Sequence, residues 1–400
     1  MKKIFLYILF LVLIFSVMNQ NICYMSSAAS SVEKNQQSDK DLEIKDRNIA
    51  VDEDSKQNML SEKELEESEE ERNEKLASKS RYLTNKGSYM EVVLDVKDGD
   101  NITVQLQAAF FLAAAKATKE IPYKIVIPKG TYHLSSTVHI YSNTSLAIKD
   151  VVFVRDFQEG PMLMSGNFME DSPYIEQEQN IIIQGGTFDG NCFDTLYGAV
   201  TISFSNLYFP YAKNVQLIGV KICNNMGGHH VEMNGVDNII IRDCIFDKYY
   251  ANKTVTDSYK KEALKFGVME LVSSDGEEIR KLTCNQILVK NNTFRDVYQG
   301  IGFDYIPGSK VYKNVSIHNN TFISCRREAM ILSSLSRSNI SKNRIENVRT
   351  GIWIQSIDPL RESKKWNCKI WQNNSKKGDR GLDLRIYPMI LNPYSVLSRW

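Results

Sequence analysis

Three charged residues stand at spacings that could place them on neighbouring strands. Glu232, Lys265 and Asp304 each follow a large apolar residue in short segments of alternating hydropathy. Alternate side chains of a strand point to opposite faces, so the apolar neighbours would fill an interior and the charged residues would face outwards. Parallel strands lie ~4.8 Å apart, which would bring these groups within ~5 to 10 Å of one another.

Two carboxylates and an ammonium at this separation suit acid–base chemistry. Neighbouring charges and partial burial push the pKa values of such groups apart, so that one can act as the acid and another as the base. We predict Glu232, Asp304, Lys265 and His230 as catalytic residues. The alternative is a solvated stripe of charged side chains without a catalytic role.

Two reactions on sugar chains fit this set. Two carboxylates about 6.5–9.5 Å apart leave room for the water that inverting glycoside hydrolysis requires. Lyase or epimerase chemistry at a uronate instead needs a cation that neutralises the sugar carboxylate and a base that removes a proton. Lys265 or an arginine could supply the cation, and His229 or His230 the base.

Further residues near these positions could bind the substrate. The segment 247–261 is a long insertion with three tyrosines, and insertions on a rigid scaffold often build binding sites. No Cys or His spacing is typical of zinc, and we predict no metal or other cofactor. A calcium site is an alternative that the few outward Asp residues do not support. The predicted substrate-binding residues are His229, Tyr250, Arg326, Arg327, Trp353 and Gln355.

The elements that must position these residues come from a repeat. One phrase, an aliphatic triplet followed by polar residues and an aromatic or aliphatic one, returns at intervals of about two dozen residues. Such a period, in short β-branched runs separated by Gly and Asn, predicts an all-β fold, a right-handed parallel β-helix. The third aliphatic residues are Ile183, Leu217, Ile241, Val289, Ile317, Ile340 and Ile370.

Two stacks are expected from the phase of the repeat. An apolar residue follows the third aliphatic residue by five positions, and an asparagine follows four of the later ones by three positions. Stacked amides can bond along the solenoid and satisfy buried backbone groups. The apolar stack comprises Phe188, Ile222, Phe246, Phe294, Phe322 and Ile345, and the Asn ladder comprises Asn292, Asn320, Asn343 and Asn373.

The N-terminal part of the chain differs in composition. Residues 1–29 carry two lysines, an apolar run and small residues, which predicts a secretory signal peptide and a secreted product without a membrane span. Residues 30–88 are charged and poor in aromatics, which predicts a disordered linker. Residues 89–400 form the predicted β-helix domain, and its Ala- and Gln-rich segment 103–118 is expected to be a helix that caps the first coil.

Charge and cysteine content narrow the remaining classes. A net charge of +1 and no basic stripe interleaved with aromatics argue against nucleic acid as a partner. Six cysteines remain after residue 29, and an even number permits disulfides. Because Cys244 stands in the phase of the Asn ladder and Cys223 directly follows a position of the apolar stack, we favour the interpretation that the cysteines are small buried hydrophobic residues. Lipidation of Cys23 is an alternative that the preceding Gln20 to Ile22 do not favour.

Two groups of segments carry a resemblance to known families. The turn Asp98–Gly99, the following helix and the segment 127–132 (Ile-Pro-Lys-Gly-Thr-Tyr) resemble the opening of the pectate-lyase-like β-helix superfamily. The segments 185–191, 228–232 and 262–267 resemble strands of glycoside hydrolase family 28 (polygalacturonase) and related bacterial proteins. Gly267 stands where the relatives carry an Asp, and the paired-Asp strand of true polygalacturonases is absent from the sequence.

Repeat, candidate residues and resemblance together predict a secreted β-helix protein that acts on an acidic polysaccharide. The resemblance implies glycoside hydrolysis or lyase or epimerase chemistry in a groove on one sheet. A non-catalytic glycan-binding surface protein or adhesin with a degraded active site is the alternative. Fold-level resemblance does not decide between them, because one fold hosts many functions.

Overall fold

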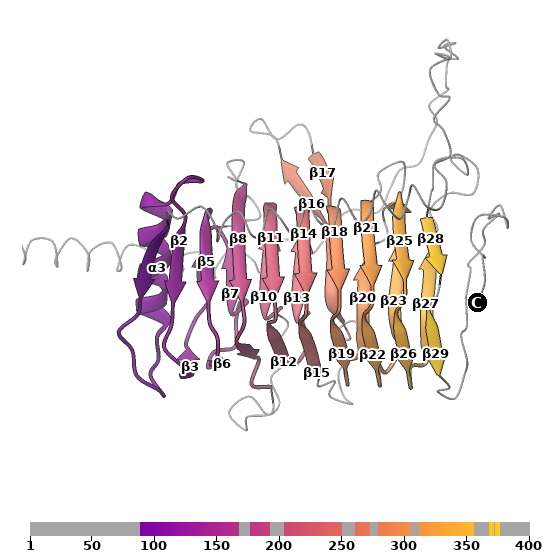
Figure 1. Cartoon of the computed structure of the whole chain (residues 1–400), viewed down its shortest axis with the longest axis horizontal. Helices are drawn as coiled ribbons and strands as arrows, with labels where there is room; N and C mark the ends of the chain where they lie inside the picture. The colour runs from indigo at the N-terminus through magenta and orange to yellow at the C-terminus, as the bar shows by residue number, and fades with distance from the viewer. Residues whose placement is uncertain are drawn as a thin grey trace, which may run out of the picture. The chain divides into compact units, whose positions relative to one another are not determined.

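The computed structural model describes residues 89–167, 177–192, 204–249, 261–272, 279–304, 306, 312–355, 368–371 and 373–376. The predicted signal peptide and linker, residues 1–88, lie outside the described residues. Three parallel sheets run the length of the domain, and each coil contributes one strand to each sheet (Figure 1). Within the described residues, no helix is both long and apolar enough to cross a membrane.

We name the sheets A, B and C. The strands of sheet A are β1 (Met90–Val93), β2 (Tyr123–Val126), β5 (Thr144–Ala147), β8 (Glu178–Gln184), β11 (Ala212–Ile218), β14 (Asp237–Arg242), β18 (Asn285–Lys290), β21 (Tyr312–His318), β25 (Ser338–Ser341) and β28 (Cys368–Trp371), with β24 (Leu335–Ser336) beside β21. The strands of sheet B are β3 (Gly130–Leu134), β6 (Val151–Arg155), β9 (Thr187–Asp189), β12 (Lys221–Asn225), β15 (Ile245–Tyr249), β19 (Thr293–Arg295), β22 (Thr321–Ile323), β26 (Arg344–Glu346) and β29 (Asn374–Lys376). The strands of sheet C are β4 (Val138–Ile140), β7 (Leu163–Ser165), β10 (Leu207–Pro210), β13 (Val231–Asn234), β16 (Glu262–Val272), β20 (Gln299–Phe303), β23 (Glu328–Ser333) and β27 (Thr350–Gln355), with β17 (Ile279–Thr283) antiparallel to β16.

The predicted registers of sheets A and B are confirmed. The third aliphatic residues of the repeat, from Ile183 to Ile370, are paired in one continuous row of sheet A. On sheet B the predicted apolar stack is fully buried. The rings of Phe246, Phe294 and Phe322 stack with centroids 4.5 and 4.7 Å apart and interplanar angles of 4° and 7°. Offset-stacked rings add to the stabilisation that their burial provides.

The predicted Asn ladder is also confirmed. Asn292 Nδ2 donates to Asn320 Oδ1 at 2.9 Å, Asn320 Nδ2 to Asn343 Oδ1 at 3.0 Å, and Asn343 Nδ2 to Asn373 Oδ1 at 2.9 Å. Each of these amides also donates to a backbone carbonyl of the same interior. The ladder begins at Cys244, whose backbone N–H donates to Asn292 Oδ1 at 2.8 Å.

A second Asn row bends the chain into sheet A. The backbone φ angles of its four members lie between 56° and 60°. These members are Asn143, Asn180, Asn214 and Asn238. Their amides are joined from coil to coil at 2.7–2.8 Å. Asn adopts this left-handed conformation at lower cost than most residues, because its short side chain bonds locally. These positions begin the repeated phrase, but their role as a ladder follows only from the structure.

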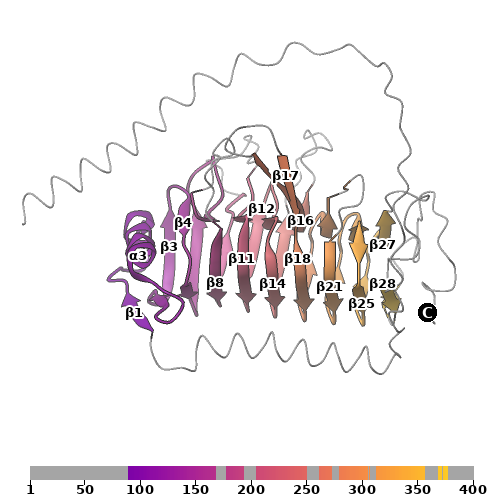
Figure 2. The same ribbon diagram turned by 90° about the horizontal axis from the view of Figure 1, so that it is seen from above.

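The predicted cap is a helix, α3 (Thr103–Lys116), at the N-terminal end of the solenoid (Figure 2). Leu106, Phe110 and Ala113 are buried against the first coil, and Asn101 Oδ1 accepts hydrogen bonds from the N–H and Oγ of Thr103 at 3.1 and 2.8 Å. β5 and β6, which follow in the chain, belong to different sheets, and a turn that includes Asp150 separates them.

Candidate functional site

The outward face of sheet C carries the predicted catalytic residues. Strand register aligns one outward residue from each coil in a row that we call the sheet C column. Its middle members are the charged residues Glu232 and Lys265, and aromatic residues stand towards both ends. The sheet C column comprises His139, Met164, Tyr208, Glu232, Lys265, Gly302, Ile331 and Trp353.

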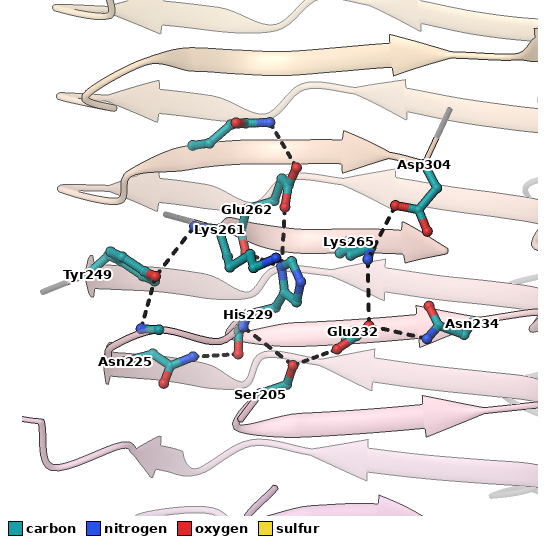
Figure 3. A network of polar contacts seen from close by, with 12 residues as sticks. Ser205, Asn225, His229, Glu232, Asn234, Tyr249, Lys261, Glu262, Lys265 and Asp304 are labelled. Atoms are coloured by element: carbon teal, nitrogen blue, oxygen red, sulfur yellow. Dashed lines mark hydrogen bonds and ion pairs between the residues drawn. The ribbon is translucent and has the colours of Figure 1, made fainter. Parts of the chain in front are cut away.

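Glu232 is held by three neighbours. Ser205 Oγ donates to Glu232 Oε2 at 2.8 Å, Asn234 Nδ2 donates to Oε1 at 3.2 Å, and Lys265 Nζ lies 3.7 Å from Oε1 (Figure 3). Burial raises the pKa of Glu232, but His229, Lys265 and the two hydrogen bonds outweigh it and leave the pKa below its ordinary value. Glu232 is therefore an ionised carboxylate at neutral pH.

Lys265 lies between two carboxylates. Its Nζ is 3.2 Å from Asp304 Oδ1 as well as 3.7 Å from Glu232 Oε1 (Figure 3). Burial favours the neutral amine, but Asp304, Glu232 and Glu262 outweigh burial and raise the pKa of Lys265. Lys265 is therefore a fixed cation, which suits binding and charge neutralisation and does not suit a general base.

Asp304 lies on the coil after Lys265, two residues beyond the sheet C column. Gly302, not Asp304, is in register with Lys265, and Asp304 follows the end of β20. A Cβ built on Gly267 would come 3.0 Å from Asp304 Oδ2 and 1.9 Å from Asn234 Oδ1. The glycine that replaces the Asp of the resembled family thus makes room for the carboxylate of the next coil.

His229 and Glu262 form a second polar pair beside the column. His229 Nδ1 lies 3.0 Å from the Glu262 carbonyl oxygen and 3.4 Å from Glu262 Oε2, and Gln299 Nε2 donates to Glu262 Oε1 at 3.3 Å (Figure 3). Burial lowers the pKa of His229 against the opposing effect of Glu232 and Glu262. A Cβ on Gly302 would come 2.5 Å from Glu262 Cγ, so the Glu262 side chain lies over Gly302.

The prediction that His230 shares this face is wrong. His230 is fully buried, and its ring lies 6.4 Å from that of Phe246 and 6.2 Å from that of Tyr249. Its Nε2 lies 3.3 and 3.2 Å from the carbonyl oxygens of Asp247 and Lys248. Burial lowers its pKa to about 4. His230 lies one residue before the start of β13, and both it and Val231 are buried, so alternation does not hold where the chain enters β13.

The predicted substrate-binding residues are only partly brought together. Arg326 and Arg327 lie in the turn before β23, and Trp353 is a half-buried member of the sheet C column. Gln355 ends β27 in register with Ser333, and its side chain lies outside the described residues. Tyr250 also lies outside the described residues.

A two-stranded antiparallel hairpin extends sheet C near β16. β16 continues past the end of its neighbours on sheet C and pairs with β17 from Val268–Thr283 to Val272–Ile279. The hairpin projects from the solenoid (Figure 1, Figure 2). Met269, at the start of the hairpin, packs closely against Gly235, because a Cβ on Gly235 would come 2.4 Å from Met269 Cβ.

Sequence reasoning missed four residues of this site: Tyr208, Glu262, Ser205 and Asn234. Tyr208 stands 24 residues before Glu232 in an alternating segment, a signal that matches the basic period of the repeat. Its hydroxyl accepts a hydrogen bond from Asn234 Nδ2 at 3.3 Å. Ser205 and Glu262 carried no such signal. Ser205 precedes β10 and Glu262 is the first residue of β16, so neither lies inside a strand, where alternation applies.

The cysteines are interior residues. Five described cysteines are buried, which supports the interpretation as small hydrophobic residues: Cys192, Cys223, Cys244, Cys284 and Cys325. Burial raises the pKa values of Cys223, Cys244 and Cys284 to about 12. Among the described residues, no three His, Cys, Asp or Glu side chains are grouped so that they could hold a metal ion.

Comparisons with known proteins agree with this architecture. A family model described as periplasmic copper-binding protein (NosD) matches residues 272–378, which is less than half of the chain. The plasmin and fibronectin-binding protein A of Streptococcus pneumoniae (strain ATCC BAA-255 / R6) is 24% identical over 264 residues, which cover 59% of this chain and 37% of that relative. This chain thus spans well under half of the relative's length.

Solved structures establish the class of protein. The Streptococcus pneumoniae surface protein and adhesin PfbA is 18% identical over 73% of this chain and 76% of its own, with a TM-score of 0.50. A family 28 exopolygalacturonase of Yersinia enterocolitica is 10% identical over 74% of this chain and 67% of its own, with a TM-score of 0.38. The chain is a right-handed parallel β-helix protein, as the sequence predicted.

Proposed function

We propose that this protein binds a glycan along the sheet C column and does not hydrolyse it through Glu232 and Asp304. One observation carries the proposal: the Lys265 ammonium lies between the two carboxylates, 3.7 Å from one and 3.2 Å from the other. Inverting hydrolysis needs a water in such a gap, and the ammonium fills it. It also needs a protonated general acid, whereas the pKa of Glu232 is lowered.

The same residues are well suited to binding. The Glu232 carboxylate and the Lys265 ammonium lie on one rigid face with the side-chain amides of Asn234 and Gln299. Together they offer several hydrogen bonds to sugar hydroxyls without side-chain reorganisation. Tyr208 and Trp353 stand five strands apart in the column, which is ~24 Å at the spacing of parallel strands. Their rings supply apolar surface at the two ends of a ligand several sugars long.

The relatives support a location outside the cell. The printed names describe a surface protein and adhesin and a plasmin- and fibronectin-binding protein. We therefore propose that this chain acts at the cell surface or in the extracellular space, in agreement with the predicted signal peptide. Its predicted preference for an acidic glycan belongs to the same proposal.

A second candidate function is glycoside hydrolysis by another pair. Burial raises the pKa of Glu328, against the opposing effect of Arg327 and Arg349, as a general acid requires. Glu262 pairs with Gln299 on the strand between them, and its charge also raises the pKa of Glu328. Glu328 is 5% exposed, which restricts access of a substrate to it and places this candidate second.

A product-resolved glycan panel separates the two functions. Purified protein is incubated with pectic, alginate-like and host glycans, and binding is measured beside the release of reducing ends and of unsaturated uronate. Binding without products, lost in Tyr208→Ala and Trp353→Ala, is the expected result. Products that disappear in Glu328→Gln or Glu262→Gln would establish the hydrolytic function and overturn the proposal of binding alone.

A further inference from the structure

The charges on the face of sheet C are divided along the solenoid. Three carboxyl groups, those of Glu232, Glu262 and Asp304, surround the single ammonium of Lys265. Burial lowers the pKa of His229, so its ring compensates these carboxylates less at neutral pH than an exposed histidine would. The middle of the face is thus rich in acceptors and repels an anionic group of a ligand.

The next coils carry the opposite charge. Arg326 and Arg327 lie in the turn that enters β23, and Arg349 lies in the turn that enters β27. The two turns are adjacent, because Arg327 O accepts a hydrogen bond from the N–H of Thr350 at 3.0 Å. The N–H of Arg327 donates to Tyr298 O of the preceding coil at 2.9 Å. Arg326 and Arg349 are exposed, so both guanidinium groups are accessible to a ligand.

The carboxylate beside these arginines offsets them poorly. Arg327 Nε lies 3.5 Å from Glu328 Oε2, but Glu328 is 5% exposed and its buried Oε2 accepts no hydrogen bond. Burial raises the pKa of Glu328 in spite of Arg327 and Arg349. Arg326 and Arg349 are exposed, whereas the carboxylate that Arg327 contacts is buried. Planar guanidinium groups bind carboxylate and sulfate through paired hydrogen bonds.

We propose that Arg326, Arg327 and Arg349 form an anion subsite beside the sheet C column, which takes the carboxylate or sulfate of an acidic sugar. The uncharged hydroxyls of the neighbouring sugars then bind the acceptor-rich residues around Lys265. This subsite rests on the proposed glycan binding and fixes the direction of the ligand along the solenoid. Ile331 and Trp353 provide the apolar floor next to the subsite, in register with Gly302.

The test compares acidic and neutral probes on matched variants. Oligogalacturonate, its carboxyl-reduced neutral counterpart and a sulfated heparin-derived oligosaccharide are titrated into the wild-type protein and into the double variant Arg326→Gln/Arg349→Gln. The control is Arg344→Gln on sheet B, an exposed arginine that pairs with Glu346 at 2.6 Å. Arg327 is left in place because it contacts Glu328.

We expect the double variant to lose about tenfold or more in affinity for an acidic probe and to show a weaker salt dependence. Affinity for the neutral probe and all affinities of Arg344→Gln should stay at the wild-type level. The probe that loses affinity distinguishes a carboxylate from a sulfate ligand. Equal affinity of the double variant and the wild type for both acidic probes would overturn the subsite.

The variants Tyr208→Ala and Trp353→Ala separate this inference from the proposal on which it rests. If they abolish binding while the arginine variant binds normally, the glycan site stands and the anion subsite fails. If neither the aromatic nor the arginine variants change binding, both fail. A wild-type protein that binds the neutral probe and neither acidic probe also rejects the subsite.

Discussion

Glu232 and Lys265 occupy directly paired positions on β13 and β16, with Glu232 Oε1 3.7 Å from Lys265 Nζ. Their side chains are 21% and 20% exposed, so the pair is only partly screened by water. Each group stabilises the charged form of the other, which lowers the pKa of the carboxyl and raises that of the amine.

Removal of the ammonium should expose this dependence. We expect Lys265→Met to raise the pKa of Glu232 and to lower the free energy of unfolding by about 1–2 kcal/mol, less than for a fully buried pair because of the partial exposure. Carbon-detected NMR titration of the glutamate carboxyls and urea unfolding measure the two effects. In the double variant Glu232→Gln/Lys265→Met most of the stability should return, and a double variant that is less stable than Lys265→Met would contradict the coupling.

The Asn ladder should be more sensitive than its surroundings. Asn320→Ala removes the acceptor of the Asn292 N–H and Nδ2 and the donor to Val289 O, all inside the solenoid. Buried groups left without a partner cost about 1–3 kcal/mol each, so we expect a loss of about 3 kcal/mol or more in the free energy of unfolding. Chemical denaturation measures it.

Thr321→Ala is the matched control for the ladder, because Thr321 is the next residue and is half-buried on sheet B. We expect this variant to lose less than about 1 kcal/mol, as is usual for substitutions near the surface. Similar losses in the two variants would show that the ladder does not stabilise the fold through its amides.

The stability should fall as the pH drops through the range of the buried histidines. The pKa of His230 is about 4 in the folded protein and about 6.5 when the chain is unfolded. The unfolded chain therefore binds the proton first, so the contribution is complete above pH 6.5 and is lost as the pH falls towards 4. It amounts to about 3 kcal/mol over that range.

Urea unfolding from pH 7.5 to 4.5 in the wild type and in His230→Gln tests this effect. The Gln amide can still donate to the carbonyls of Asp247 and Lys248, and it does not titrate. His318, whose pKa burial also lowers to about 4, contributes separately, and His318→Gln should remove its own share. A slope of stability against pH that is as steep in His230→Gln as in the wild type would reject the assignment.

The buried thiols should not react in the folded protein. Cys244 and Cys284 are 1% and 0% exposed, and burial raises both pKa values to about 12. Because the thiolate is the reactive form, iodoacetamide at pH 8 should label neither residue before unfolding and both in urea. Peptide mass spectrometry gives the labelling of each site, and the same map without reductant should show no disulfide at these two residues.

The solenoid itself could be predicted from the sequence. Stacking of identical positions imposes one local rule on every coil, and the rule appears as a repeat of aliphatic, aromatic and Asn residues. The row from Ile183 to Ile370, the Phe stack and the amides of Asn292 and Asn320 all lie where that repeat places them. Strand alternation also placed Glu232 and Lys265 on one face, because both lie in the interior of regular strands.

The positions of the residues around Glu232 and Lys265 could not be predicted from strand alternation. His229 and His230 precede β13 at a bend, and only the folded backbone places the first beside Glu262 and the second in the core. Asp304 reaches Lys265 because Gly267 leaves space on the preceding coil, a relation between residues 37 positions apart in the sequence.

Sequence by itself determined the coiled architecture and the outward direction of the charged residues, since both follow from the period of two within strands and of about two dozen between coils. Tertiary structure alone decided the charge state and the partners of the site. These depend on burial and on distances of 3 to 4 Å between coils, and the lengths of the bends and insertions set those distances. For that reason three of the residues expected from the sequence to form an acid–base set are, in the folded chain, joined by ion pairs between Lys265 and the carboxylates of Glu232 and Asp304.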